Sequence, residues 1–459
     1  MESVNTNIST IRAPFPPRAA RFPLIGSLPD IIRHKGNYFL EAWKQYGDIY
    51  RLNIGPVDIV VLNRPDYAQH VLRDHARNYT KGGSLNEALR GLLGNGLVTS
   101  EGDYWRRQRR MMQPQFHRQY LAGITGLMNE AIEEAMRDWD ELAASGEPVE
   151  VLQLYSRVTM NVIMKTMFGR GINPDEAQAA AEAFSYIIRY LMQEIVTGSL
   201  PEWVPVPGRK KYREALATVD EFIYRMIRQR RENPTSSMDI VSMMTQMVDE
   251  DTNEPMTDVE IRDEAITIFG AGYETTSVAM AWGSHLLTRA TDIQDKLRSH
   301  VDEVLQGRSA QFEDLRGLSY SAMVFSEIMR LYPPAPLLTR MAVEEDYIDG
   351  YRIKAGQTVF IMTAPIHHHP DFWSNAEDFN PERFSPAAEK GRHPLAWMPF
   401  GAGQRQCIGK DFAMMEGTLI LSRLMQHYRL VAADKPDPEF ALAVTLAPKD
   451  GIWVRLEKR

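Results

Sequence analysis

The sequence has very little cysteine and no long hydrophobic run. Cys407 is the only cysteine among 459 residues, so a disulfide within the chain is excluded and a reducing compartment is expected. The first 20 residues contain charged side chains and three prolines, instead of the apolar block that a signal peptide or a membrane span requires. We therefore expect a cytoplasmic protein without a membrane anchor.

An excess of positive charge is also missing. The chain has 52 lysine and arginine residues against 60 aspartate and glutamate residues, a net charge of −8, which argues against nucleic-acid binding as its main task. Hydrophobic residues make up 44% and charged residues 24% of the chain. This is ordinary globular composition, and a chain of this length can bury a large core. It excludes a disordered tail, a collagen and a small disulfide scaffold.

Hydrophobic periodicity divides the chain into helical and strand-forming parts. Residues 65–332 have mostly helical spacing, whereas strand signals lie near both ends of the chain. Because the strand segments flank the helices, we expect residues 1–459 to fold as one mainly α unit with a small β lobe, rather than as sequential domains. The β lobe is expected to comprise residues 46–63, 339–362 and a hairpin in the last thirty residues.

The lone cysteine lies in the glycine-rich segment FGAGQRQCIG, residues 400–409. Gly403 and Gly409 would permit tight backbone conformations, and a helix predicted after the cysteine would favour a thiolate. One thiolate suits haem iron, whereas zinc would need further cysteine or histidine ligands. Arg405 could bind a carboxylate such as a haem propionate, and Phe400 could shield the sulfur from water. The alternative is a buried free cysteine, but the complete spacing F-x-x-G-x-R-x-C-x-G favours haem.

This segment resembles the haem-ligand loop of the cytochrome P-450 superfamily, and five motifs in family order extend the resemblance over most of the chain. It implies the P-450 fold, with a large helical domain and a small β-rich domain. It also implies haem b (iron protoporphyrin IX) with Cys407 as the axial ligand of the iron. The implied reaction inserts one atom of O₂ into an apolar substrate, and the electrons come from a ferredoxin or flavodoxin with its reductase, because no fused reductase is expected.

A long helix is expected over residues 259–289, and its middle reads FGAGYETTS. Two glycines and two adjacent threonines weaken a helix interior, which indicates a functional deformation. The resemblance implies that this segment crosses the haem, with Ala271 against it and the helix opened beside the bound oxygen. Thr275 would hydrogen-bond that oxygen or its water, and Glu274 would help to relay protons. The alternative is a core helix with a packing glycine and back-bonded threonines.

Glu327 and Arg330 lie at positions i and i+3 of another predicted helix, close enough to pair. Alone, this spacing is typical of a common surface salt bridge. Arg383, in the segment NPERF, resembles the family's second arginine. The resemblance then implies a buried structural trio that holds the haem-loop region and takes no part in the chemistry.

Trp105 and Arg109, at i and i+4 in WRRQRR, share a helix face and resemble the family's haem-propionate contacts. Arg340 resembles another propionate contact. The alternative for the WRRQRR segment is a solvated basic helix. Its remaining arginines could attract an acidic electron donor: Arg106, Arg107 and Arg110.

Three consecutive histidines, His367–His369, suggest a metal site at first sight. In an extended chain, successive side chains point to opposite sides, so three adjacent imidazoles do not easily converge on one ion. We therefore expect no metal there.

The resemblance implies a mostly apolar substrate pocket and hence an apolar substrate. Two other functions remain open: a peroxide-driven peroxygenase, and a non-catalytic haem protein that senses a gas or carries a ligand. The presence of both Glu274 and Thr275 argues against each of them. The implied pocket segments are residues 85–97, 269–271, 335–339 and 444–446, with 184–206 as a mobile roof.

Overall fold

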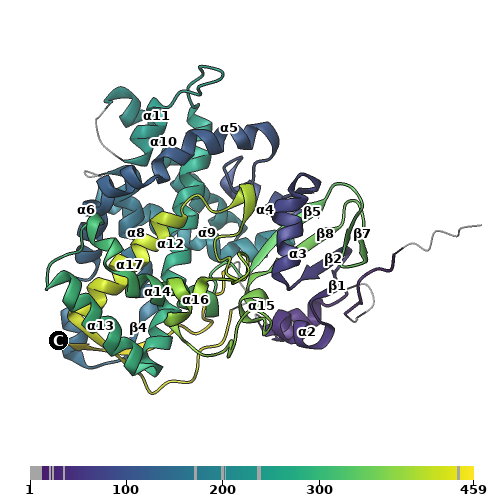
Figure 1. The fold of residues 1–459 in the computed structure, drawn as a ribbon. Helices are drawn as coiled ribbons and strands as arrows, with labels where there is room; N and C mark the ends of the chain where they lie inside the picture. Colours follow the sequence, from purple (N-terminus) through teal and green to yellow (C-terminus); the bar gives the residue numbers. More distant parts are fainter. Residues whose placement is uncertain are drawn as a thin grey trace, which may run out of the picture.

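The computed structural model confirms a mainly helical molecule with a small sheet lobe (Figure 1). The helical body lies on the left of Figure 1, and the lobe, built from purple N-terminal and green strands, lies on the right. Within the described part of the chain, we find no helix that is long and apolar enough to cross a membrane. The structure describes residues 13–19, 22, 25–34, 37–169, 173–197, 201, 203–234, 239–441 and 445–459.

The lobe is a five-stranded sheet with the order β1-β2-β8-β5-β3. Strands β2 and β8 pair in parallel, and the other neighbours pair antiparallel. Strands therefore occur in both expected segments, 46–63 and 339–362. A separate two-stranded hairpin of β6 and β7 extends the lobe. The strands are β1 (Ile49–Ile54), β2 (Val57–Leu62), β3 (Tyr79–Thr80), β5 (Leu337–Ala342), β6 (Asp346–Ile348), β7 (Tyr351–Ile353) and β8 (Thr358–Met362).

The C-terminal hairpin forms as expected but does not join the lobe. Strand β9 (Tyr428–Ala432) pairs antiparallel with β10 (Trp453–Lys458), and β10 also pairs with β4 (Val149–Glu150). This three-stranded sheet packs on the helical body through α7 (Trp139–Ser145) and the long helix α12 (Asp258–Arg289). The expectation that the hairpin belongs to the β lobe is therefore wrong, because its pairing partner follows α7.

The remaining helices surround α12 or cover the sheet lobe. The shorter ones are α1 (Leu28–His34), α2 (Tyr38–Tyr46), α3 (Pro65–Gln69), α4 (Ser84–Leu93), α5 (Gly102–Met112), α11 (Ile240–Gln246), α15 (Thr363–His368) and α16 (Pro386–Glu389). The longer ones are α6 (Arg118–Ala135), α8 (Val151–Phe168), α9 (Pro174–Thr197), α10 (Arg209–Glu232), α13 (Thr291–Leu305), α14 (Ser319–Leu331) and α17 (Lys410–His427). Single-turn helices are η2 (His70–Asp74), η3 (Ala76–Asn78), η4 (Gln113–Phe116), η5 (Phe312–Arg316), η6 (Pro381–Phe384) and η7 (Gly403–Arg405).

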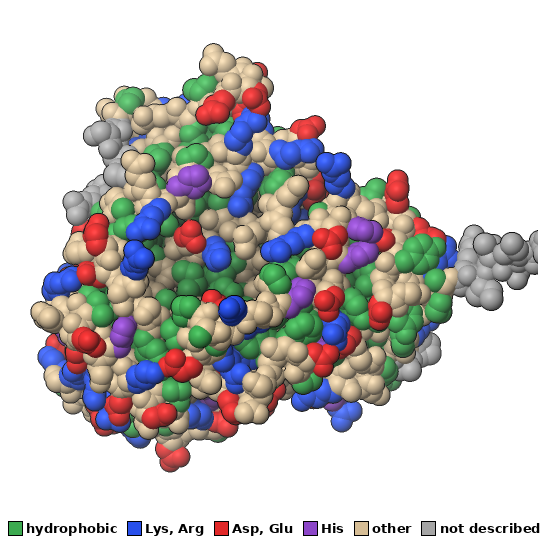
Figure 2. Space-filling model, in the orientation of Figure 1, with side chains coloured by type: hydrophobic (Ala, Val, Ile, Leu, Met, Phe, Trp, Pro, Cys, Tyr) green, Lys and Arg blue, Asp and Glu red, His purple; other side chains and the backbone are tan. Residues whose placement is uncertain are grey.

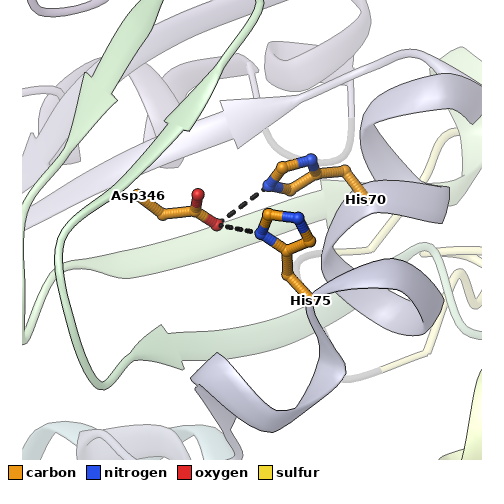
Figure 3. Close-up of side chains that lie close together, drawn as sticks. All are labelled: His70, His75 and Asp346. Carbon is orange, nitrogen blue, oxygen red and sulfur yellow. Dashed lines mark hydrogen bonds and ion pairs between the residues drawn. The ribbon is translucent and has the colours of Figure 1, made fainter.

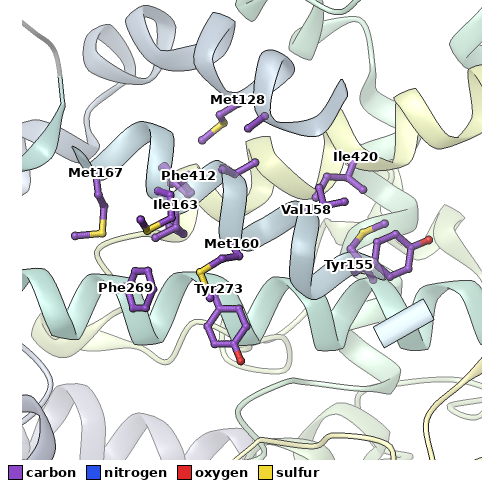
Figure 4. Packing of buried hydrophobic residues seen from close by; sticks show 14 of the residues in the cluster. Met128, Tyr155, Val158, Met160, Ile163, Met167, Phe269, Tyr273, Phe412 and Ile420 are labelled. Atoms are coloured by element: carbon purple, nitrogen blue, oxygen red, sulfur yellow. The ribbon is translucent and has the colours of Figure 1, made fainter. Parts of the chain in front are cut away.

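Helix α12 is the centre of the body and confirms the helix expected over 259–289. It begins after Thr257, which forms a capping box with Glu260. It is buried on almost every side and packs against α8, α10, α14 and α17. Figure 4 shows side chains of α8 and α17 meeting α12 in this core. Gly272 allows the close approach, because a Cβ there would overlap the Ile163 side chain of α8.

Candidate functional site

Cys407 lies in a tight loop between η7 and α17. Its backbone N–H donates to the Phe400 carbonyl at 2.9 Å, which closes the loop. Cys407 is exposed at the loop, yet the loss of solvation among the surrounding protein atoms raises the pKa of the thiol, while the backbone N–H of Gly409 and the nearby Arg109 and Lys81 act in the opposite direction. The isolated thiol therefore keeps its proton, and a metal ion would be needed to stabilise the thiolate.

Two glycines give the loop its shape, but only one of them was expected. Gly403 has φ +70°, and a Cβ there would overlap the carbonyl oxygen of Leu72. Gly401 has φ +66°. Gly409, in contrast, has φ −84°, a conformation open to any residue, so the expectation for Gly409 was wrong. Its role is to cap α17, which begins at the next residue.

Four cationic side chains gather beside this loop. Burial, followed by the charges of Arg340 and Arg405, lowers the pKa of Lys81 to about 7. Burial, followed by the charge of Arg405, lowers the pKa of Arg340 to about 10. Burial is also the main reason for the lowered pKa values of Arg405 and Arg109. The lowered pKa values indicate that the surroundings of these four side chains offer too few negative partners to stabilise their charged forms.

The partners of these cations are few. Arg405 donates to the Ser100 carbonyl at 2.8 Å and to the Glu101 carboxylate at 2.6 Å. Arg340 is only 7% exposed, and among the described residues it donates to the Thr339 carbonyl alone, at 2.7 Å. Lys81 Nζ donates to the Val98 carbonyl at 2.7 Å. Among the described residues, Glu101 is thus the carboxylate that Lys81, Arg340 and Arg405 share.

The expected pair on α5 also reaches this region. Trp105 is buried, and the Arg405 guanidinium lies 3.8 Å from the centre of its ring, as in a cation–π contact. Arg109 donates to the carbonyl of Gln406 at 2.9 Å. The two α5 residues therefore contact the residues that immediately precede Cys407.

Haem fits the donors that are present. One thiol is offered for the iron, and among the described residues the carboxylate of Glu101 acts on Lys81, Arg340 and Arg405, whereas Arg109 is affected by Cys407, so basic groups outnumber acidic ones here. Buried cations require an anionic partner, and a ligand with two carboxylates would supply it. Lys81 was missed in the sequence because nothing in its surroundings there distinguishes it from a surface lysine.

Helix α12 brings the other expected site residues together. Ala271 is exposed although its neighbours Phe269 and Tyr273 are buried. Thr275 donates to the Ala271 carbonyl at 2.7 Å, and Glu274 accepts from the Thr445 hydroxyl at 2.8 Å. Burial raises the pKa of Glu274. Successive residues of α12 thus carry a hydroxyl and a carboxyl group, each with its own hydrogen-bond partner.

The expected opening of α12 is not observed. The helix is continuous through Gly270 and Gly272, and Thr275 is back-bonded to residue i−4. A Cβ on Gly270 would lie 2.6 Å from the Phe184 ring of α9. The glycines therefore serve close packing, as the alternative interpretation of this motif predicted, and this part of the expectation was wrong.

Two further buried carboxyl groups were missed. Burial raises the pKa values of Glu264 on α12 and Glu416 on α17 to about 8, so both largely keep their protons at neutral pH. Glu264 accepts from the backbone N–H of Leu97 at 3.2 Å, and Glu416 lies beside Thr276. The only signal in the sequence is an acidic residue on a helix face that is otherwise apolar.

The structural trio forms as the resemblance implied. Arg330 donates to both oxygens of Glu327, at 2.7 and 2.9 Å, and the Arg383 guanidinium lies 3.3 Å from the same carboxylate. Glu327 and Arg330 are fully buried. The remaining N–H groups donate to the backbone carbonyls of His367, Ala376, Asp378, Ser374 and Asn375.

The basic segment on α5 is largely compensated by acidic partners. Arg107 pairs with Glu260, and Arg110 pairs with Asp249 and Asp251. Figure 2 shows Lys and Arg side chains interspersed with Asp and Glu side chains over this face. Arg106, with its side chain 63% exposed, pairs only with Asp103 of its own helix among the described residues. The segment is therefore less basic than its sequence indicates.

The three adjacent histidines take separate partners. His367 accepts from the Met398 backbone N–H and contacts the Arg330 carbonyl, His368 contacts Glu377, and His369 contacts Asp48. They lie at the end of α15, and the extended conformation assumed for them was wrong.

The expected pocket segments converge in part on α12. Phe184 of α9 packs edge-on against Phe269, with ring centres 4.8 Å apart. Leu446 donates its backbone N–H to the Pro334 carbonyl at 3.0 Å, so the C-terminal turn lies beside the segment at 335–339. Residues 85–93, expected as a loop, belong to α4. Val444, and residues 198–200 and 202 of the roof, lie outside the described residues.

Comparisons with known proteins agree on one family. A family model described as cytochrome P-450 matches residues 16–454. Cyclooctatin synthase of Streptomyces melanosporofaciens is 30% identical, with 91% of each chain covered. Pentalenene oxygenase of Streptomyces avermitilis is 28% identical, covering 93% of this chain and 94% of its own. The crystal structure of the cytochrome P450DA haem domain superimposes with a TM-score of 0.88 at 24% identity, with 98% of each chain covered.

Proposed function

The chain belongs to the cytochrome P-450 family, and we propose that it oxygenates an apolar organic substrate at a haem b whose iron is bound by Cys407. Membership of the family makes it a haem-thiolate monooxygenase. The observation that carries the residue assignment is the lone thiol beside four basic side chains, of which Lys81, Arg340 and Arg405 share the Glu101 carboxylate. When bound, the haem supplies the activation of O₂.

The residues around the loop would bind and orient this group. Cys407 would lose its proton on binding iron, and the Gly409 N–H would then donate to the thiolate sulfur. The haem carboxylates would be held by Arg340, Arg405, Arg109 and Lys81. The ring of Trp105 would support Arg405 through its contact with the guanidinium group. Phe400 would limit the access of water to the sulfur, and its carbonyl already fixes the Cys407 backbone.

The residues of α12 would hold and transfer the protons that the reaction requires. Glu274 is held by Thr445, and burial raises its pKa, which favours the protonated form that a proton donor requires. Thr275 can turn its hydroxyl away from the Ala271 carbonyl and donate to a group beside the exposed Ala271. Glu416, protonated at neutral pH, provides a buried proton donor next to Thr276.

The substrate we propose is an apolar molecule. The segments that meet near α12 contribute Phe184, Phe269 and Leu446. The similar pentalenene oxygenase is named for action on pentalenene, which supports an apolar substrate class. We further propose that two electrons arrive from a separate ferredoxin or flavodoxin with its reductase, inside the cytoplasm. Family membership is the support for this last part.

Two variants test this assignment. In Cys407→Ser, the strongly red-shifted Soret band that thiolate ligation gives the reduced protein with carbon monoxide should disappear. An unchanged band would refute Cys407 as the ligand.

For the proton relay, Thr275→Ala should continue to consume NAD(P)H while much of the oxygen is lost as hydrogen peroxide. Thr288→Ala is the matched control, because Thr288 also bonds a carbonyl of its own helix, that of His285 at 2.9 Å, and lies three turns away. Tight coupling of electrons to product in Thr275→Ala would remove Thr275 from the relay. Product formation from hydrogen peroxide alone, at the electron-fed rate, would instead indicate the peroxygenase.

A further inference from the structure

A second cluster of metal-ligating side chains lies in the sheet lobe, where η2 packs against η7 of the cysteine loop. It consists of His70, His75 and Asp346, one ligand atom from each lying within 4.8 Å of the other two (Figure 3). His70 Nε2 is 2.8 Å and His75 Nδ1 is 3.3 Å from the same oxygen, Oδ2, of Asp346. The mechanism above does not use these residues.

The local fold explains why the two imidazoles meet. Residues 70–74 form a single π-turn, η2, in which the backbone N–H of His75 donates to the carbonyl of His70 at 2.8 Å. This spacing of five residues places both side chains on the same side, with ring centres 3.9 Å apart. π-turns interrupt regular helices and are frequent at functional sites. The turn therefore aims one ring nitrogen of each histidine at the same carboxylate oxygen, which accepts a hydrogen bond from each in the absence of a metal.

The carboxylate is held from behind. The Tyr79 hydroxyl donates to Asp346 Oδ2 at 2.8 Å, and the backbone N–H of Tyr347 donates to Oδ1 at 2.8 Å. Asp346 is buried, with 10% of its side chain exposed, whereas the side chain of His75 is 48% exposed. Hydrogen bonds to a ligating carboxylate from such surrounding groups are typical of metal sites. The exposure of His75 leaves an entry path and room for a water ligand.

The distances suit a small transition-metal ion. With metal–ligand bonds of about 2.0–2.1 Å, two ligands of a tetrahedral zinc ion lie about 3.3 Å apart. The separation of His75 Nδ1 from Asp346 Oδ2, 3.3 Å, equals this value, whereas that of His70 Nε2, 2.8 Å, is a hydrogen-bond length that a bound ion would lengthen. Two imidazoles and one carboxylate are the ligands that zinc accepts, whereas calcium and magnesium require mainly oxygen.

We propose that His70, His75 and Asp346 bind one divalent transition-metal ion of the zinc class, with a water as fourth ligand. The ion would connect η2 to strand β6, two elements more than 270 residues apart in the sequence. It would also support the cysteine loop, because η2 packs on η7 and the Leu72 carbonyl lies directly against Gly403.

The test uses the full haem-loaded chain, stripped of loosely bound metal with a chelator and then titrated with zinc chloride in a calorimeter. Wild type should bind one zinc ion at this site, at least tenfold more tightly than His70→Ala, His75→Ala or Asp346→Asn. Zinc should raise the melting temperature of wild type and not that of the three variants. X-ray absorption at the zinc edge should show scattering from two imidazole rings.

His34→Ala is the matched control, because His34 also pairs with a carboxylate, Glu41 at 2.7 Å, and no second histidine is part of that pair. Its zinc affinity should equal that of wild type. Equal zinc affinity of wild type and His75→Ala, or a zinc edge without imidazole scattering, would overturn the proposal. His75 is exposed, so its replacement leaves the fold intact and the test valid even if His70→Ala does not fold.

Discussion

Two clusters of buried charge near the cysteine loop are built in opposite ways. In the trio, Glu327 lies between Arg330 and Arg383, and the remaining guanidinium N–H groups reach backbone carbonyls. In the cluster around Arg340, three basic side chains share Glu101, and Arg109 lies beside Cys407. In the trio, opposite charges balance each other in the folded chain itself. In the cluster around Arg340, the positive charge is balanced only when an anion binds. A buried charge without compensation therefore indicates a ligand, and a compensated one indicates structure.

The largest effect is expected in the trio. Glu327→Gln would leave two buried guanidinium groups without their carboxylate, and breaking a buried pair in this way costs about 3–5 kcal/mol. We expect the free energy of unfolding, measured in urea, to fall by that amount, or the variant to be recovered without folded protein.

The control for this variant is Glu214→Gln, which breaks the exposed Lys210–Glu214 pair on α10. It should change the unfolding free energy by less than about 0.5 kcal/mol. If Glu327→Gln were as stable as this control, the trio would have no structural role.

The two clusters also show which contacts can be predicted from the sequence and which cannot. Regular periodicity predicted α12 to within one residue at its start, and the segment Glu327–Arg330 predicted its own pair, because i and i+3 are adjacent on any helix. Lys81 and Glu101 were not found, because they meet Arg340 and Arg405 only through tertiary packing. Their spacing in the chain carries no period that could indicate the contact.

Sequence periodicity also fails to distinguish between alternative backbone conformations. The glycines and threonines of α12 fit an opened helix and a closely packed one equally well, and the packing of Phe184 and Ile163 decides between them. Likewise, His70 and His75 would not share a face of an ordinary α-helix, so periodicity concealed a pair that the π-turn creates.

A smaller effect, of the opposite kind, is expected for Arg340→Leu. The variant removes a charge that burial disfavours, so the haem-free protein should unfold within about 1 kcal/mol of wild type. The variant should retain haem less well, because it loses the charge-assisted hydrogen bond from Arg340 to a haem carboxylate, worth about 1.5–3 kcal/mol. Transfer of haem to an excess of an apo-globin acceptor should accelerate about 10- to 100-fold.

Arg340→Lys retains the positive charge and should lie between the variant and wild type in haem transfer. If Arg340→Leu lost several kcal/mol of stability without haem and kept haem as wild type does, the contrast between the two clusters would be refuted.

The effect that is smallest over a single pH unit is a dependence on pH that comes from Lys81. Its pKa is about 7 in the folded chain and about 10.4 in an unfolded one, so the unfolded chain binds more protons between these values. The haem-free protein should therefore gain up to about 1.4 kcal/mol of stability from this residue for each pH unit above 7, and lose it as the pH falls towards 7.

Haem binding should depend on pH with the opposite sign. Two carboxylates beside Lys81 favour its charged form and raise its pKa, so binding takes up a proton above pH 7. Haem affinity should then fall by up to about tenfold per pH unit between pH 7 and 9. In Lys81→Met both slopes should flatten, whereas Lys210→Met, at a side chain 92% exposed, should keep them. Haem transfer rates and urea titrations at pH 7, 8 and 9 measure both, and parallel slopes in wild type and Lys81→Met would show that Lys81 is not part of the haem-binding charge cluster.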